Sequence, residues 1–199
     1  MGKNDIRGFE SPVRMIRVLI QCLLPALLFA GSLCAQVNSH EPLTAVPEVD
    51  LSRYMGIWYE IARLPNKFQD HCTGDVTATY SLLDDGDIKV INSCRRSDGG
   101  MSVVEGRAKR AGDDEPDSKL KVRFAPAILS FLPFVWGDYW IILLAPDYSH
   151  AVIGEPDRKY LWILARTPSI DDAALENLLD QIRLKGYDLT GLLRTKNAP

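Results

Sequence analysis

The sequence has few of the residues from which catalytic and metal sites are built. It contains three histidines and four cysteines among 199 residues. No His-x-x-x-His or Cys-x-x-Cys spacing occurs, so we predict no metal site and no cofactor. The Gly-x-Ser-x-Gly elbow of hydrolases and the glycine-rich phosphate loop are missing as well. The sequence therefore favours a binding protein over an enzyme.

An excess of positive charge is also missing. The chain has 23 Lys and Arg against 26 Asp and Glu, which gives a net charge of −3. This balance predicts no nucleic-acid partner, and no block of like charge indicates a disordered tail. Apolar residues make up 46% of the chain and charged residues 25%, as in an ordinary folded domain with one sizeable core.

Long apolar segments are absent except for one near the start of the chain. Residues 18–30 form an apolar run with arginines before it and small residues at 31–35 after it. This pattern is typical of a secretory signal. A membrane-spanning helix needs roughly 20 residues, so an uncleaved anchor is the weaker alternative. We predict a signal peptide over 1–35, with Met15 as a candidate for the true start, and export to the periplasm or the periplasmic face of the outer membrane.

The four cysteines fall into two groups. Cys34 follows the apolar run, where bacterial lipoproteins carry a lipidated cysteine, but Leu33 stands where Gly, Ala or Ser is usual. Lipidation of Cys34 and its removal with the signal both stay open. Cys72 and Cys94 lie in the part of the chain that follows the signal peptide, and an oxidising compartment favours a disulfide between them over two free thiols.

After a predicted linker over 36–49, residues 50–199 form the predicted domain. Short alternating runs are separated by turn residues such as Asp84-Asp85-Gly86. The predicted strands are 56–63, 74–82, 88–94, 102–110, 119–125, 138–145, 150–154 and 160–166. Eight consecutive strands with hairpin-length links predict an all-β fold, an antiparallel up-and-down β-barrel without open edges.

Helical spacing occurs once, after the strands. Leu175, Leu178, Leu179 and Ile182 recur at the period of a helix. Ser169 is the predicted N-terminal cap, and Gly186 is the predicted end. The apolar stripe of such a C-terminal helix must be buried, and we expect it to pack on the outside of the barrel.

Three short motifs lie at informative places in this pattern. Gly56 and Trp58 form a Gly-x-Trp motif at the start of the first strand. Asp147 and Tyr148 lie in the turn between the sixth and seventh strands, and Arg166 ends the eighth. Together these motifs resemble the three signature regions of the lipocalin family.

Longer segments extend the resemblance. Residues 50–63, 76–82 and 156–168 are similar to the bacterial outer-membrane, apolipoprotein D-like subgroup of that family. Pro146 stands where the family has threonine before Asp-Tyr. The resemblance covers residues 49–194. It implies an eight-stranded barrel that stores or transports lipids, such as fatty acids or lysophospholipids, for maintenance of the envelope.

The resemblance also implies which side chains face inward. Trp58 would close the base of the barrel, with Arg166 across its ring in a cation–π contact. The period of two, anchored on these residues, places the other inward positions. The predicted cavity lining is Val76, Ala78, Tyr80, Val90, Asn92, Val122, Phe124, Tyr139, Ile141, Trp162 and Leu164. This mostly apolar set suits a lipid, whereas a barrel filled by its own side chains is the alternative.

Residues 126–136 form an unusually apolar loop at the predicted open end. Exposed apolar loops mark binding or membrane contact. We expect Phe131, Phe134 and Trp136 to lie at the mouth, to gate the cavity and to contact a membrane or partner surface. A lid folded inward and a homodimer contact are the alternatives.

Basic residues fall in loops at the same predicted end. They are Lys67, Arg95, Arg96, Arg158 and Lys159. As a group they would suit the carboxylate or phosphate of an anionic amphiphile, whereas a solvated surface is the alternative for each one. The function predicted from the sequence is lipid binding. A partner-binding envelope protein with a filled barrel and a lipocalin-fold enzyme are the alternatives.

Overall fold

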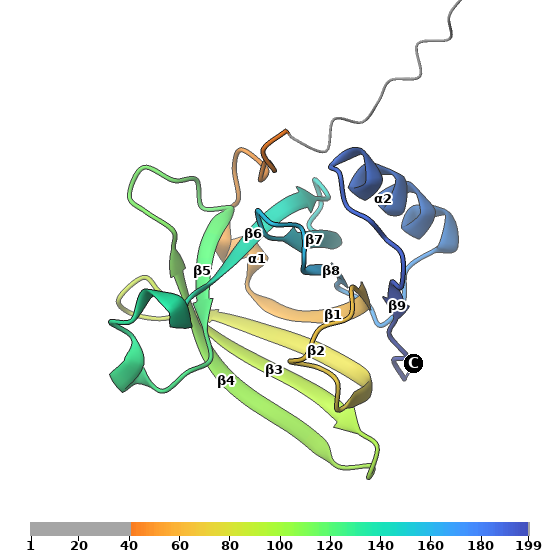
Figure 1. Ribbon diagram of the computed structural model, residues 1–199, viewed down its shortest axis with the longest axis horizontal. Coiled ribbons are helices and arrows are strands. Elements are labelled where there is room, and N and C mark those ends of the chain that lie inside the picture. Colours follow the sequence, from red (N-terminus) through yellow and green to blue (C-terminus); the bar gives the residue numbers. More distant parts are fainter. Residues whose placement is uncertain (1–40, 199) are drawn as a thin grey trace, which may run out of the picture. The chain divides into compact units, whose positions relative to one another are not determined.

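The computed structural model describes residues 41–198, which form an antiparallel sheet closed into a barrel (Figure 1). The strand order is β2-β3-β4-β5-β6-β7-β8-β1-β9, and a further pairing of β1 with β2 closes the ring. The barrel strands are β1 (Gly56–Arg63), β2 (Cys72–Leu82), β3 (Ile88–Arg96), β4 (Met101–Arg110), β5 (Lys119–Arg123), β6 (Gly137–Leu144), β7 (His150–Gly154) and β8 (Leu161–Ala165). The predicted eight-stranded up-and-down barrel is confirmed.

Two predictions from the start of the chain lie outside the described residues. They are the signal peptide over 1–35 and the lipidation of Cys34. Within residues 41–198, no helix has the length and apolar character needed to cross a membrane.

The hairpins owe their tight turns to glycine. Gly86, between β2 and β3, has a φ of +86°, and Gly99, between β3 and β4, has a φ of +81°. Residues with a Cβ rarely adopt this left-handed region, so Asp-Gly sequences are well suited to these turns. Cys72 and Cys94 form the predicted disulfide between β2 and β3, with 5.6 Å between their Cα atoms.

The stretch predicted as a linker contributes to the core over its described part. Leu43 and Val49 are buried, and Val46 packs against the interior cluster of side chains. The Val46 amide donates to the Ile141 carbonyl at 2.9 Å. The interpretation as a linker rested on prolines and polar residues. It missed single apolar side chains that reach the barrel without any regular period.

A helix packs on the outside of the barrel, as predicted. The helix α2 (Asp172–Leu184) buries the four residues of its predicted apolar stripe. They share a core cluster with Ile142, Val152 and Ile163 of the barrel. The cap prediction was wrong, because the Asp171 carboxylate, not Ser169, accepts from the first free backbone N–H groups of the helix.

Two elements that adjoin β1 were not predicted. The short helix α1 (Leu51–Tyr54) precedes β1, and the Asp50 carboxylate caps its first turn. The two-residue strand β9 (Leu193–Arg194) pairs with β1. Both are shorter than one repeat of a readable hydrophobic period, so the sequence offers no pattern for either.

Candidate functional site

Trp58 and Arg166 close one end of the barrel. The Trp58 side chain is fully buried, and its indole N–H donates to the Tyr54 carbonyl at 2.8 Å. The central carbon of the Arg166 guanidinium lies 3.8 Å from the centre of the Trp58 ring. Arg166 also donates to the carbonyls of Arg53 and Ile57. The arginine therefore ties α1 and the start of β1 to the end of β8.

The contact between Arg166 and Trp58 explains why the Gly-x-Trp motif begins with glycine. Gly56 has a φ of +95°, and a Cβ placed on it would lie 3.3 Å from a terminal nitrogen of Arg166. A side chain at this position would be strained and would crowd the guanidinium. Glycine thus allows Arg166 to reach the Trp58 ring.

The Asp-Tyr turn belongs to the same closed end. The Tyr148 hydroxyl accepts from the Asp50 amide at 2.9 Å, and the Arg53 guanidinium lies 4.0 Å above the Tyr148 ring. The Asp147 carboxylate accepts from the Ser149 amide at 3.0 Å, and this backbone N–H lowers the pKa of Asp147. These contacts join the turn between β6 and β7 to the entry of β1.

Above this base lies an interior cluster that contains most of the predicted lining. Its members from the predicted set are Ala78, Tyr80, Val90, Val122, Tyr139, Ile141, Trp162 and Leu164. Val76 and Asn92 continue the inward faces of β2 and β3. Phe124 lies just beyond the end of β5, with its ring over Gly106 where a Cβ would collide with it.

Three tyrosines place polar groups within this apolar interior. The Tyr139 hydroxyl is hydrogen-bonded to Tyr54 at 2.8 Å and to Tyr80 at 2.9 Å. Burial raises the pKa of Tyr80 to about 12, and it also raises the pKa of Tyr54 and of Tyr139 above the ordinary tyrosine value, so all three are neutral at pH 7. Three hydroxyls share two hydrogen bonds, which leaves one proton of the trio for another acceptor.

Asn92 adds an acceptor to the same interior. Its side-chain oxygen is buried and has no hydrogen-bond partner among residues 41–198. The interior thus offers both a donor and an acceptor to a bound molecule, within walls that are otherwise apolar.

Two side chains show that the interior is not filled along its whole height. Val104 lies on the same face of β4 as Ala108, which packs in the interior cluster. Val104 is nevertheless 44% exposed, and Phe124 is 40% exposed. Solvent therefore reaches the inward face of the barrel near the start of β4 and the end of β5.

A buried polar network was missed in the sequence. Glu60, almost fully buried in β1, accepts from Arg63 at 2.7 Å and from Gln69 at 2.6 Å. Thr195 donates to the same carboxylate, and the Trp162 indole donates to the Gln69 side-chain oxygen at 2.7 Å. The period of two that places Trp58 on the inner face of β1 also places Glu60 there. The alternation of β1 therefore indicated that Glu60 is buried.

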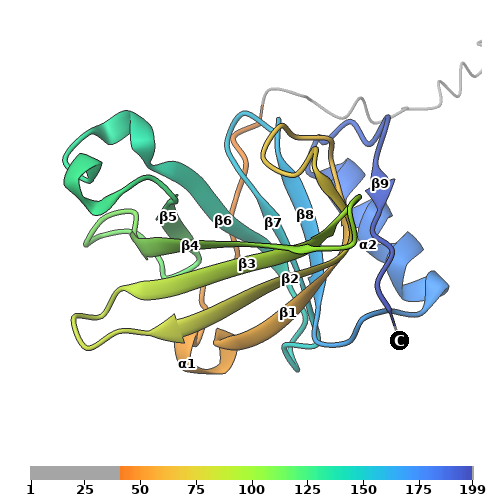
Figure 2. The same ribbon diagram turned by 90° about the horizontal axis from the view of Figure 1, so that it is seen from below.

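The apolar loop over 126–136 contains two short 3-10 turns, η2 (Ala127–Leu129) and η3 (Pro133–Val135), and Figure 2 shows it projecting from the ends of β5 and β6. Phe131 is 76% exposed and Phe134 is 80% exposed, so these rings do not fold inward as a lid. Trp136 differs from them, because its ring lies beneath Lys109 and Arg123.

The basic residues predicted at the mouth do not form a free cluster. Arg95 pairs with Asp75, Arg96 with Asp98, and Lys159 with Asp157. The Arg158 side chain donates to the carbonyls of Lys185, at the end of α2, and Glu41. Each of these four basic residues therefore has a partner within the protein, which the sequence pattern did not indicate. Lys67 is exposed.

Comparisons with known proteins agree with this architecture. The family model described as a lipocalin-like domain matches residues 49–197. Temperature-induced lipocalin-1 of Arabidopsis thaliana is 42% identical over 160 residues, which cover 80% of this chain and 85% of the relative. The outer membrane lipoprotein Blc of Escherichia coli (strain K12) is 40% identical over 158 residues, covering 79% and 84%.

A solved structure shares the fold. Insecticyanin from the tobacco hornworm Manduca sexta aligns with a TM-score of 0.58 at 23% identity, covering 78% of this chain and 85% of that one. With the family model, the relatives and the closed barrel in agreement, the chain belongs to the lipocalin family.

Proposed function

We propose that the protein binds lipids, such as fatty acids or lysophospholipids, in the barrel interior and stores or transports them without chemical turnover. The observation that carries this proposal is the accessible upper interior. Val104 and Phe124 face inward and yet remain substantially exposed. When an acyl chain covers such an apolar surface, the complex is stabilised by about 25 cal/mol per Å² of apolar surface removed from water.

The polar groups of the interior fit the same proposal. A lipid's hydroxyl, or a carboxyl group in its neutral form, can both accept the spare tyrosine proton and donate to Asn92 Oδ1. The lining residues predicted from the sequence would then surround the chain of the ligand.

The proposed location follows from the start of the chain and from a relative. The name of the E. coli relative describes an outer membrane lipoprotein. We propose export by the signal peptide over 1–35, with the barrel in the periplasm or on the periplasmic face of the outer membrane. Lipidation at Cys34 would attach it there, and removal of Cys34 with the signal would leave it unattached.

Binding in the interior is tested by blocking the mouth. We expect Val104→Trp to weaken binding of a fluorescent fatty acid by at least about tenfold, equivalent to 1.4 kcal/mol, because the indole would occupy the accessible inward face. Val103→Trp is the matched control, since Val103 is the neighbouring residue on the outer face and is also exposed. Equal affinities of the two variants in a fluorescence titration would contradict an interior site.

The loop over 126–136 supports a second part of the proposal, contact with a membrane surface. Ile128, Phe131 and Phe134 are exposed apolar side chains of this loop, and together they are the apolar patch of the proposal. Lys109 and Arg123 lie over the Trp136 ring at the base of the loop and place positive charge behind this patch. Apolar tips backed by cations suit an anionic lipid surface.

We expect Phe131→Ser combined with Phe134→Ser to lower binding to vesicles containing phosphatidylglycerol by at least about tenfold, because burying a phenylalanine contributes about 1.5–3 kcal/mol. Co-sedimentation with the vesicles measures this, and Val103→Ser controls for loss of an exposed apolar side chain elsewhere. Unchanged co-sedimentation would refute membrane contact. A dimer that the double variant dissociates in analytical ultracentrifugation would assign the patch to a homodimer instead.

A further inference from the structure

The wall of the barrel between β1 and β2 is completed by the C-terminal segment. Direct pairing of β1 with β2 ends at Tyr59 and Thr77. Beyond this point residues 193–198 lie between the two strands. On one side the Thr195 amide donates to the Ile61 carbonyl at 2.9 Å, and on the other the Asp75 amide donates to the Lys196 carbonyl at 2.8 Å.

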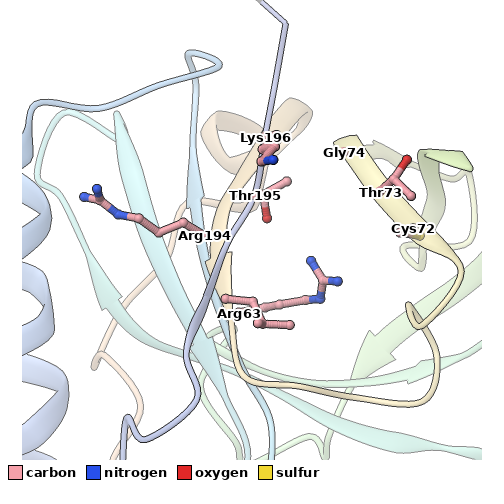
Figure 3. Close-up of a pocket in the computed structure, with 8 residues that line it drawn as sticks. Arg63, Cys72, Thr73, Gly74, Arg194, Thr195 and Lys196 are labelled. Carbon is pink, nitrogen blue, oxygen red and sulfur yellow. The ribbon is translucent and has the colours of Figure 1, made fainter. Parts of the chain in front are cut away.

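A pocket of about 290 Å³ lies beside this segment (Figure 3). Arg63 of β1 lines it, together with Thr73 and Gly74 of β2 and Thr195 and Lys196 of the C-terminal segment. Figure 3 shows the Arg63 guanidinium pointing into the space between these two sides. The volume is near the lower end of that of small-molecule sites.

Arg63 has hydrogen-bonding capacity that the protein does not use. The residue is only 8% exposed. Of its five N–H donors, one bonds to Glu60 at 2.7 Å and another reaches the Gln69 carbonyl at a long 3.5 Å. Its Nε is buried without a partner among residues 41–198. A buried guanidinium with so few acceptors is costly unless a further acceptor completes it.

The charges around the pocket leave a positive excess. Glu60 is matched by Arg63, and Asp75 by Arg95. Within residues 41–198, Lys196 has no carboxylate at ion-pair distance. The remaining cation of the segment, Arg194, extends away from the pocket and pairs with Asp172 at 2.9 Å (Figure 3).

The hydroxyls of the pocket act as donors within the protein and add no negative charge. Thr73 donates to the Arg95 carbonyl, and Thr195 to Glu60. The groups left to a ligand are the ammonium of Lys196 and the unused donors of Arg63. This combination selects for an oxyanion.

We propose that this wall pocket is an oxyanion site, distinct from the lipid site proposed around Val104 and Phe124, that takes a phosphate or carboxylate group. The group is held between the guanidinium of Arg63 and the ammonium of Lys196. Its source is either a free anion or the headgroup of a lipid. The site does not depend on lipid binding in the interior, so the two proposals fail separately.

The test is a titration of the purified chain with inorganic phosphate, followed by two-dimensional 1H–15N NMR. We expect saturable shifts of the Thr73, Gly74, Thr195 and Lys196 amides. Lys196→Gln should weaken phosphate binding about fivefold, because it removes one of the two cations that hold the anion. Lys159→Gln, which removes the same charge at another exposed site, should leave the affinity unchanged.

Arg63→Lys tests the buried partner while it retains the charge. We expect weaker phosphate binding with a native-like NMR spectrum, since the ammonium lacks the planar set of donors. If this variant unfolds, the comparison of Lys196→Gln with Lys159→Gln still tests whether phosphate binds in the pocket. Absence of saturable shifts at the pocket, or equal affinities of the two glutamine variants, would overturn the proposal.

Lysophosphatidic acid distinguishes the two sources of the anion. Competition between this lipid and inorganic phosphate for the pocket amides would assign the site to a lipid headgroup. Phosphate shifts that the lipid does not displace would assign it to a free anion. In the Val104→Trp variant, retention of phosphate binding would show that the pocket acts independently of the interior.

Discussion

Trp58→Ala is expected to lower the free energy of unfolding by about 3–5 kcal/mol, as for other fully buried aromatic residues. The substitution removes the side chain that fills the closed end and the ring on which Arg166 lies at 3.8 Å. It also removes the indole donor to the Tyr54 carbonyl, which ties α1 to β1. Urea unfolding, followed by circular dichroism, measures the change.

The control for this prediction is the residue beside Trp58. Ile57 lies on the outer face of β1 and is half exposed. Ile57→Ala should therefore change the unfolding free energy by less than about 1 kcal/mol, as is usual for surface positions. A Trp58→Ala variant that unfolds at the same urea concentration as the parent would contradict the role of Trp58 as the base of the barrel.

Glu60→Ala is expected to destabilise the protein by a similar amount, about 3–5 kcal/mol, because it leaves a buried guanidinium without its counter-charge. The Glu60 carboxylate accepts from Arg63, Gln69 and Thr195. One carboxylate thus joins β1, the segment before β2 and the C-terminal segment. The measurement is again urea unfolding at neutral pH.

Two comparisons separate this effect from a general loss of charge. Glu105 forms an ion pair with Lys89 at 2.9 Å on the exposed surface of the barrel. Glu105→Ala should cost no more than about 1 kcal/mol. The double variant Glu60→Leu with Arg63→Met should recover much of the lost stability, since neither charge then remains buried. Equal effects of Glu60→Ala and Glu105→Ala would refute the account of the network.

The barrel could be predicted from the sequence because its strands carry a strong signal. The alternation of apolar residues and the Asp-Gly turn at Gly86 define consecutive hairpins, which leave few other topologies. The same period of two, anchored on Trp58, correctly indicated interior positions such as Tyr80 and Ile141. These features depend on local patterns, and a single sequence displays such patterns directly.

What could not be predicted depends on contacts between distant segments. The segment 193–198 has no readable period, yet it forms β9 and fills the wall beside β2. The ion pair of Arg95 with Asp75 bridges positions that meet only once the sheet has formed. The charge of a side chain is visible in the sequence, but its partner is set by the register of the strands.

Glu60 shows a different reason for a missed prediction. Its inward position follows from the alternation of β1, but an acidic residue within an apolar interior contradicts the usual rule that charges face water. The bulge between Glu60 and Ala62 then brings Arg63 to the same carboxylate. No pattern in the sequence predicts this bulge.

The most direct test of the central proposal is native mass spectrometry of the protein as purified from its expression host. Lipid binding in the interior predicts a lipid adduct of defined mass on the parent chain and on Val103→Trp, and little or none on Val104→Trp. A parent chain that carries no lipid, and that also takes up none when fatty acid or lysophospholipid is added, would contradict the proposed function.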